Sequence, residues 1–455
     1  MDIEKFNNYF FIGIAGTGMS AIAQYLKGTG KNVSGSDREF GREKKMLIQE
    51  QFEKQGIRCF YQDGSGIDAD THVVIVSTAI EDTNIEYRKA VELGVPIIKR
   101  SELLAAISSS KKTIAVGGTS GKSTTTAMIF HILYENGYQP SLMTGAGLTS
   151  LQKKGLPGNA YVGTSEWLVI EADESDGSII HYQPEIAVVL NIERDHKEFE
   201  ELMQLFSTFR KHTRKTFIVN QDHAMVKTLS MDSRYDFGTN GGEGYSGSQF
   251  GQIEFGISFL INGTSFKIPV IGRHNMENAL AATAVAGAAG ISIENSAKAL
   301  ESYEGIYRRT QLVGNRNGIY VIDDFAHNPA EISAAIMACR QIGKRVIAWF
   351  QPHGYGPLKF MHEELAVKVA AALRKEDIFI TSDVYYAGGT VDRDISPEIV
   401  IRSVLDAGKN ALYIAERKKL TEEIKKLATP GDIILLMGAR DPSLSDFALE
   451  VLKNL

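Results

Sequence analysis

Cysteine is scarce in this sequence, with Cys59 and Cys339 the only two among 455 residues. Two cysteines cannot build a disulfide framework or a cysteine-rich metal site, and such scarcity is typical of a reducing compartment. The N-terminus lacks a charged segment followed by an apolar one. The longest apolar run, at 279–290, is shorter than the ~18 residues that a membrane helix needs. We therefore expect a cytoplasmic protein without a membrane partner.

A strong net charge is also missing. The formal net charge is −6, and no long basic tract occurs, so the chain has little electrostatic attraction for nucleic acid. The basic clusters at 210–215 and 417–427 are better interpreted as solvated helix faces. The hydrophobic fraction of 43% is ample for packed cores, and the length predicts about three domains.

Strand-like and helix-like segments alternate along the whole chain, which predicts an α/β fold of three consecutive domains. The first domain opens like a Rossmann fold, with strands expected at 9–15, 32–37 and 71–77 and helices from about Met19 and near 42–55. A Gly/Ser-rich segment at 238–251 predicts a flexible hairpin connection in the second domain. The predicted domains are Rossmann-like over 1–107, P-loop ATPase-like over 108–310 and Rossmann-like over 311–455.

A glycine-rich loop joins a predicted strand at 113–116 to a helix expected from Ser123. Backbone N–H groups and the positive end of the helix would together form a seat for polyphosphate. Lys122 would reach the β- and γ-phosphates, and the Ser123 hydroxyl would hold Mg²⁺. The glycine spacing departs from GxxxxGK[ST], and an ordinary turn is the alternative, but the order of strand, loop and helix favours a phosphate loop.

A second glycine-rich loop follows the first predicted strand. Gly16, Gly18 and Ala21 satisfy GxGxxG/A, and Asp37 stands about 20 residues further on, where a ribose-binding acid belongs. Alone, this pattern predicts an NAD-binding domain. The diphosphate of a UDP-sugar would bind the same helix N-terminus equally well.

Six motifs together resemble the Mur ligase family, the ATP-dependent amide-bond ligases of peptidoglycan precursor synthesis in cell wall biogenesis. The resemblance covers nearly the whole chain and is closest to the branch that joins L-alanine to UDP-N-acetylmuramate. The motifs are GIAGTGMSAIA (13–23), GGTSGKSTTTAM (117–128), EADESDGS (171–178), NIERDH (191–196), GRHNMENALAA (272–282) and the pair YRRTQ (307–311) with DDFAHNPAEI (323–332).

The resemblance implies ATP and Mg²⁺ as cofactors, an acyl phosphate intermediate, and a third domain that closes over the nucleotide. It favours a UDP-sugar over NAD in the first domain. The implied catalytic residues are Lys122, Glu171, His196 and His327, and the implied metal ligands are Ser123, Glu171 and His196. The implied ATP contacts are Gly118, Thr119, Ser120, Gly121, Lys122, Ser123, Thr124, His274, Asn275, Asn278, Arg309 and Asp324. The implied UDP-sugar contacts are Gly16, Thr17, Gly18, Met19, Ser20, Asp37 and Ser77.

Several of these assignments have rivals in the sequence. Asp173 and Glu174 lie beside Glu171, and the sequence does not say which carboxylate ligates the metal. Arg308 rivals Arg309 as the phosphate-binding arginine. The polar residues at 274–278 open a predicted helix, where an N-cap cluster is the alternative to a nucleotide contact.

The sequence departs from the alanine-adding branch at Ser120, Ser123, Asn328, 352–360 and 438–443. The C-terminal departures fall where the resemblance places the incoming amine. Three interpretations therefore remain: addition of L-alanine, ligation of a recycled peptide to the same acceptor, and a divergent nucleotide-binding paralogue. We expect a monomer or homodimer whose partners are UDP-N-acetylmuramate and an amino acid or peptide.

Overall fold

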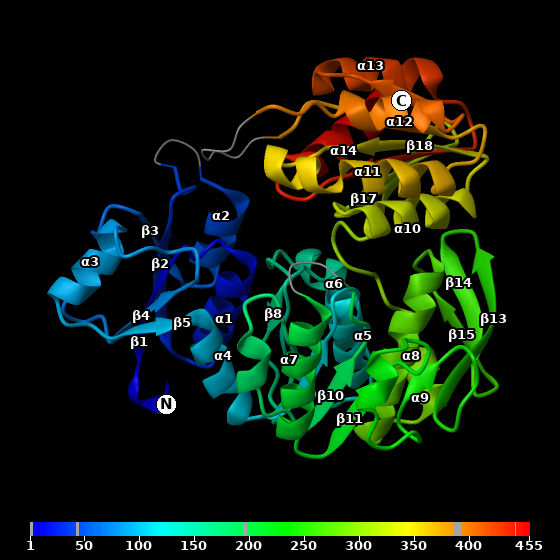
Figure 1. The fold of residues 1–455 in the computed structure, drawn as a ribbon. Coiled ribbons are helices and arrows are strands. Elements are labelled where there is room, and N and C mark those ends of the chain that lie inside the picture. The colour runs from blue at the N-terminus through cyan, green and yellow to red at the C-terminus, as the bar shows by residue number, and fades with distance from the viewer. Residues whose placement is uncertain (1–2, 42–44, 194–197, 386–392, 442) are drawn as a thin grey trace. The chain divides into compact units, whose positions relative to one another are not determined.

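The structure, a computed structural model, describes residues 3–41, 45–193, 198–385, 393–441 and 443–455 (Figure 1). The chain divides into two compact units. The first unit comprises Met1–Gln249, Phe259–Ile268 and Met276–Ile306, and the second comprises Phe250–Ser258, Pro269–Asn275 and Tyr307–Leu455. Sheets and helices alternate in both units, which confirms the predicted α/β class. The division at residues 107 and 310 stays a prediction.

The first sheet has the strand order β3-β2-β1-β4-β5, and its strand pairs are parallel. The chain passes from β1 to β2 on one side and later to β4 on the other, which makes the carboxyl end of β1 a switch point where ligands bind in such folds. The helix α1 begins there. The elements are β1 (Asn8–Ile12), α1 (Thr17–Gly28), β2 (Asn32–Asp37), α2 (Leu47–Lys54), β3 (Arg58–Tyr61), β4 (Val73–Val76), α3 (Ile85–Glu92), β5 (Ile97–Lys99) and α4 (Arg100–Ser109).

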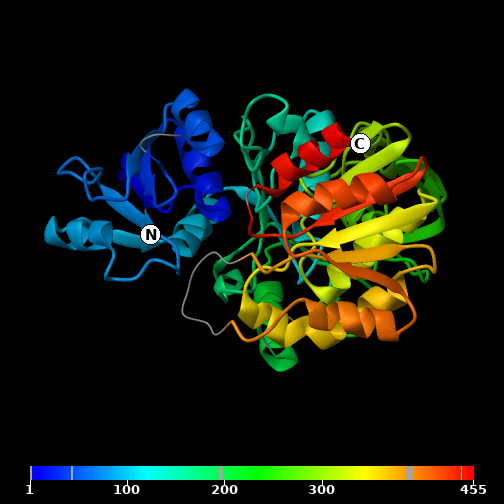
Figure 2. The same ribbon diagram turned by 90° about the horizontal axis from the view of Figure 1, so that it is seen from above.

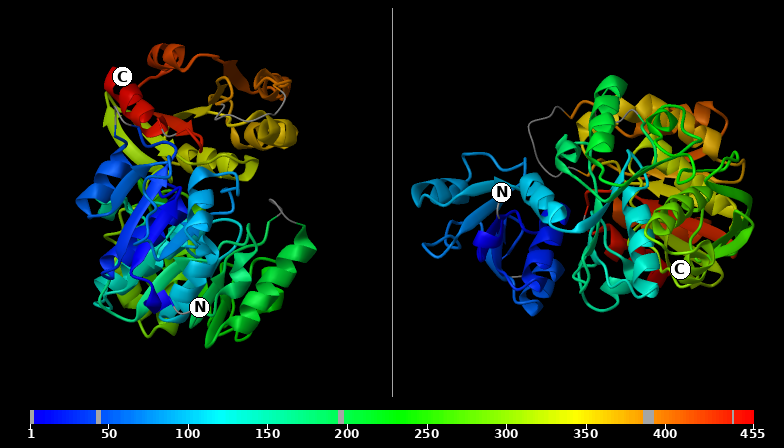
Figure 3. Two further views of the ribbon diagram at one scale, coloured as in Figure 1. Left: turned by 90° about the vertical axis from the view of Figure 1, so that its left-hand side faces the viewer. Right: turned by 90° about the horizontal axis from the view of Figure 1, so that it is seen from below.

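The second sheet, also in the first unit, has the order β11-β10-β6-β9-β7-β8. Its strands are parallel except for β8, which pairs antiparallel with β7. Both neighbours of β6 therefore end on the same edge of the sheet as β6 itself. The elements, which can be followed in Figure 3, are β6 (Lys112–Gly117), α5 (Lys122–Glu135), β7 (Ser141–Met143), α6 (Thr149–Gln152), β8 (Ala160–Tyr161), β9 (Trp167–Glu171), β10 (Ile186–Val189), α7 (Phe199–His212) and β11 (Thr216–Val219).

The predicted flexible connection at 238–251 is wrong over its second half, because residues from Tyr245 onward form a strand. A Cβ on Gly247 would lie 2.6 Å from atoms of both Met276 and Leu280, so this glycine permits close packing rather than a turn. The third sheet has the order β12-β13-β14-β15. The elements are β12 (Phe237–Gly238), β13 (Tyr245–Ile253), β14 (Gly256–Ile261), β15 (Thr264–Ile268), α8 (Arg273–Ala288) and α9 (Ile293–Leu300), and short 3₁₀ helices occur at Ile3–Lys5, Ser178–His181 and Val226–Leu229.

The fourth sheet forms the core of the second unit, in the order β16-β17-β21-β18-β19-β20. One apolar cluster includes residues of α10, α11 and α12, and another includes residues of α13 and α14. The sheet is thus covered on both faces, as Figure 2 shows. The elements are β16 (Gln311–Arg316), β17 (Ile319–Asp324), α10 (Pro329–Arg340), β18 (Arg345–Phe350), α11 (Tyr355–Ala372), β19 (Ile378–Thr381), α12 (Glu398–Asp406), β20 (Asn410–Tyr413), α13 (Arg417–Leu427), β21 (Asp432–Met437) and α14 (Leu444–Asn454). Among the helices in the described ranges, none is long and apolar enough to cross a membrane.

A buried carboxyl in the first unit predicts a pH dependence of stability. Glu86, in the first turn of α3, is fully buried and accepts a hydrogen bond from the Ser36 hydroxyl. Burial raises the pKa of Glu86 to about 7, although the hydrogen bonds from Ser36 and Gly64 oppose the rise. The folded state therefore binds this proton more tightly than the unfolded state. The associated stability is full at pH values below the unfolded pKa, near 4.5, and is lost as pH rises through 7.

We expect Glu86→Gln to raise the free energy of unfolding at pH 8.5 by about 1–3 kcal/mol, because each unit of pKa shift corresponds to ~1.4 kcal/mol. At pH 4.5 the variant and the wild type should be nearly equal. Chemical denaturation at both pH values measures this difference. Glu92→Gln, an exposed position on the same helix, is the control. Equal stability of Glu86→Gln and wild type at pH 8.5 would contradict the expectation.

Candidate active site

The phosphate loop lies between β6 and α5, as the sequence predicts. Gly121 caps α5 with a left-handed backbone, φ +83°, and a Cβ there would lie 2.7 Å from the Asn278 side-chain oxygen. Glycine is therefore required for both conformation and space. The first N–H groups of α5 have no partner within the helix, which is the property that makes a helix N-terminus an anion seat.

Asn191, which follows β10, holds this loop in shape. Its side-chain oxygen accepts hydrogen bonds from the Thr119 hydroxyl at 2.9 Å and the Ser120 N–H at 2.8 Å, and its amide donates to the Ser120 carbonyl at 3.1 Å. The sequence interpretation gave Asn191 no role. The available signal was its position at the start of the NIERDH motif, directly after a buried strand beside β6.

Lys122 forms an ion pair with Glu174, a partner that the sequence did not predict. Its ammonium donates to the Gly118 carbonyl at 2.7 Å and lies 3.0 Å from the Glu174 carboxylate. Burial raises the pKa of Glu174, and the charge of Lys122 opposes that rise. Lys122 is thus held over its own loop, with its charge balanced by Glu174.

Glu171 ends β9, directly beside β6. One of its carboxylate oxygens accepts hydrogen bonds from the Gly145 N–H at 2.7 Å and from the Thr144 hydroxyl. The other oxygen has no hydrogen-bond partner within the described parts of the chain. Asp173, by contrast, accepts bonds from the N–H and hydroxyl of Ser175 with different oxygens. Of the three candidate acids, Glu171 therefore keeps an oxygen available for a ligand.

Of the other two predicted metal ligands, the structure describes Ser123 but not His196. Ser123 lies in the first turn of α5 and is half-buried. His196 belongs to 194–197, outside the described residues. In the described ranges, no group of three or more His, Cys, Asp or Glu side chains is arranged to hold a metal by itself. Mg²⁺ commonly takes only one or two carboxylates, together with phosphate oxygens and water.

A cavity of about 310 Å³ adjoins Glu171 in the first unit. The glycine-rich loop before α1 and the end of β9 both contribute to its wall. The predicted site residues that line it are Gly16, Thr17, Gly18, Met19, Ser77 and Glu171.

Two predicted UDP-sugar contacts, Asp37 and Ser20, also form hydrogen bonds within the chain. The Asp37 carboxylate accepts hydrogen bonds from the Ala15 N–H at 3.0 Å and the Glu39 N–H at 3.1 Å. It thereby braces the loop before α1. The Ser20 hydroxyl accepts from the Asn159 amide at 2.7 Å, which joins α1 to the strand segment of β8. Neither residue lines the cavity.

The residues predicted around the start of α8 separate into two groups. Asn278 accepts a hydrogen bond from the Thr125 hydroxyl at 3.2 Å and packs against Gly121, so it lies beneath the phosphate loop. Asn275 is buried and donates to the Ile271 carbonyl at 2.8 Å, while His274 is exposed. This bond ties Asn275 to the segment before α8.

In the second unit, the two neighbouring arginines are distinct. Arg308 is buried and bonded to the Asp323 carboxylate at 3.0 Å and the Gly438 carbonyl at 2.7 Å. Arg309 is half-buried, and its guanidinium lies over the Phe325 ring. Arg308 therefore serves the packing of this unit, whereas Arg309 is more exposed and its guanidinium lies 3.8 Å from the Glu331 carboxylate.

Close to Arg309 lie the other predicted residues of this unit. Burial raises the pKa of Asp324 to about 6, although Arg309 and two backbone N–H groups oppose the rise. The His327 ring nitrogen lies 3.1 Å from the Glu331 carboxylate. Burial disfavours the charged forms of both His327 and Glu331. The hydrogen bond from His327 and the positive charges of Arg309 and His327 nevertheless hold the pKa of Glu331 at about 2. Arg309, Asp324, His327 and Glu331 thus form one charged cluster.

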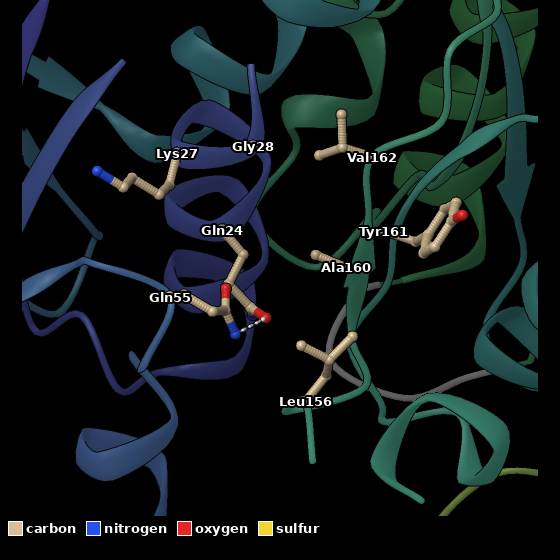
Figure 4. Close-up of a pocket in the computed structure, with 8 residues that line it drawn as sticks. All are labelled: Gln24, Lys27, Gly28, Gln55, Leu156, Ala160, Tyr161 and Val162. Atoms are coloured by element: carbon tan, nitrogen blue, oxygen red, sulfur yellow. Dashed lines mark hydrogen bonds between the residues drawn. The ribbon is translucent and has the colours of Figure 1, made fainter. Parts of the chain in front are cut away.

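A second cavity of about 270 Å³ lies beside α1 and is lined by none of the predicted site residues. The Gln55 side-chain amide donates to the side-chain amide oxygen of Gln24 at 3.3 Å at one side of it. Figure 4 shows that the Lys27 ammonium points away from the strand segment that carries Ala160 and Val162. The lining is mainly apolar, with no charge directed into the space.

Comparisons with known proteins show which family this chain resembles. Three family models match the chain: "Mur ligase family, catalytic domain" over 8–112, "Mur ligase middle domain" over 116–286 and "Mur ligase, glutamate ligase domain" over 308–440. The UDP-N-acetylmuramate–L-alanine ligase of Pelotomaculum thermopropionicum is 33% identical over 100% of this chain and 98% of its own. The ligase of the same name from Nostoc punctiforme is 35% identical over 95% and 93%.

Solved structures extend the comparison. The UDP-N-acetylmuramate–alanine ligase MurC of Thermotoga maritima superposes with a TM-score of 0.81 at 26% identity, covering 98% of each chain. A murein peptide ligase of Psychrobacter arcticus has a TM-score of 0.67 at 20% identity over 98% of each chain, which shows a shared fold. With three domain models in order and relatives matched over their full length, this chain belongs to the Mur ligase family.

Proposed function

We propose that this protein is an ATP-dependent ligase that joins L-alanine to the carboxylate of UDP-N-acetylmuramate in peptidoglycan precursor synthesis. ATP converts the carboxylate to an acyl phosphate, the amine attacks it, and ADP and phosphate are released. The observation that carries the proposal is the shared cavity, in which the glycine loop at α1 meets Glu171 at the end of β9. The names of the relatives support the choice of substrates.

The main electrostatic task is to bring a carboxylate to a triphosphate. The loop at 118–121 and the start of α5 would hold the ATP phosphates through backbone N–H groups. Lys122 would exchange Glu174 for the β- and γ-phosphates, since its ammonium already lies over the loop. The start of α1 would hold the diphosphate of the UDP-sugar. Such preorganised donors are the principal source of stabilisation in phosphoryl transfer.

We also propose Mg²⁺ as the metal, held by Ser123, Glu171 and His196. Bound Mg²⁺ would neutralise phosphate charge as the acyl phosphate forms. The unpartnered oxygen of Glu171 fits a hard cation that prefers oxygen ligands. Glu174 fits less well because it is buried and paired with Lys122.

For the second unit we propose ATP contacts at Arg309 and Asp324 and a catalytic role for His327, in line with the family motifs. His274, Asn275 and Asn278 remain proposed contacts on the adenine side. Arg309 and His327 belong to one charged cluster, which supports a role with phosphate.

Phosphate release from ATP tests the proposed function. We expect release that requires UDP-N-acetylmuramate and an amine together, with L-alanine preferred over glycine, L-serine and a peptide that begins with L-alanine. Preference for the peptide would instead support ligation of a recycled peptide. ATP binding without phosphate release for any of these amines would support the divergent paralogue and overturn the proposal.

We expect Glu171→Gln to raise the Mg²⁺ concentration for half-maximal activity by at least about tenfold, because even outer partners of metal ligands are typically worth ~10–100-fold in affinity. A magnesium titration of the initial rate measures this change. Glu166→Gln, just before the amino end of the same strand and exposed, is the matched control and should behave as wild type. An unchanged magnesium requirement in Glu171→Gln would assign the metal to other residues.

A further inference from the structure

The cavity between the start of α1 and the end of β9 has an unusual balance of charge for the ligand proposed there. Glu171 and Asp173 both line it, and both are acids. A UDP-sugar carries a negatively charged diphosphate. Arg100 is the one cation among the described residues that line the cavity.

Arg100 is held in place by Asp176, which lies in the segment after β9. Arg100 is the first residue of α4, directly after β5. One terminal nitrogen of its guanidinium lies 3.0 Å from the Asp176 carboxylate, whose other oxygen accepts from the Ser178 N–H at 2.9 Å. The Arg100 side chain is only 22% exposed. Asp176 therefore fixes the guanidinium while leaving its other nitrogens without a partner in the described ranges.

The other terminal nitrogen of Arg100 lies against the first turn of α1. A Cβ built on Gly18 would approach it to 3.0 Å and would approach the Arg100 Cδ to 3.2 Å. The second glycine of a GxGxxG loop usually admits the pyrophosphate itself. Here its missing side chain also makes room for the arginine. The guanidinium and the positive end of α1 consequently face the same space.

We infer that Arg100 is a substrate-binding residue that holds the diphosphate of the UDP-sugar, and that Asp176 is its positioning residue. The inference rests on the proposed function and assigns a residue that the glycine-loop motif does not include. A guanidinium suits this role because its planar fork matches the geometry of phosphate oxygens. The bond to Asp176 uses only part of that fork.

Binding of UDP, measured by titration calorimetry, tests this inference directly. We expect Arg100→Gln to raise the Kd for UDP and for UDP-N-acetylmuramate by about 10–100-fold, as expected for a hydrogen bond to a charged group. Arg100→Lys should fall between the variant and wild type. The Kd for ATP should stay unchanged, because its seat is the separate loop before α5.

Lys27→Gln is the matched control, since it removes a positive charge from α1 itself, at a side chain directed away from the strand segment beside it (Figure 4). It should bind UDP as wild type does. A lower unfolding temperature of Arg100→Gln with an unchanged Kd for UDP would overturn the inference and leave Arg100 as a structural ion pair. The proposed function is tested separately, because it depends on wild-type turnover and not on the variant.

Discussion

Lys122→Ala is expected to abolish turnover, with a fall in kcat of at least about 10³-fold. The ammonium lies over the phosphate loop, where the transferred phosphoryl group would lie. The loss of one preorganised electrostatic donor alone typically costs ~10²–10³-fold. Lys122 is also held in advance by the Gly118 carbonyl, so little reorganisation accompanies its use. Single-turnover measurement of phosphate release separates this effect from binding.

The fold should survive the loss of Lys122. Burial already raises the pKa of Glu174, and the loss of the opposing charge of Lys122 will raise it further, so that this carboxyl takes up a proton more readily. A thermal unfolding scan should therefore show a midpoint near that of wild type, and adding Glu174→Gln should not rescue turnover. Lys227→Ala, an exposed position in the same unit, is the control. Normal phosphate release by Lys122→Ala would remove the basis of the proposed mechanism.

Arg308→Met is expected to destabilise the second unit by about 3–5 kcal/mol, the usual cost of removing one partner from a buried ion pair. The substitution leaves Asp323 buried without its guanidinium. It also removes the hydrogen bond to the Gly438 carbonyl. Equilibrium unfolding in urea, monitored by the fluorescence of Trp349 in β18, measures the loss, because this tryptophan is buried in the same sheet.

Arg309→Met is the matched control for this prediction. Its guanidinium is half-buried, and its nearest acid is Glu331 at 3.8 Å, so its loss should change stability by less than about 1 kcal/mol. We expect it to raise the KM for ATP instead. If Arg308→Met were as stable as wild type while Arg309→Met unfolded, the roles of the two arginines would be reversed.

Much of the fold could be predicted because its signals are local. Apolar runs at 71–77 and 113–116 indicated strands, and glycine-rich loops before Met19 and Ser123 indicated helix starts. Strand 245–253 was missed because its glycines and serines are also typical of turns. Its packing against Met276 and Leu280 depends on residues that follow much later in the chain.

The sequence by itself determined the alternation of strands and helices, the glycine-rich loops and the family motifs, since strand period, helix starts and loop glycines are properties of neighbouring residues. Only the tertiary structure decided which arginine is buried, that Asn191 clamps the phosphate loop, and that Arg100 lies against Gly18. Each of these contacts joins residues from different segments of the chain. They depend on the order of the strands across a sheet. Long-range packing determines this order, and no local sequence pattern indicates it.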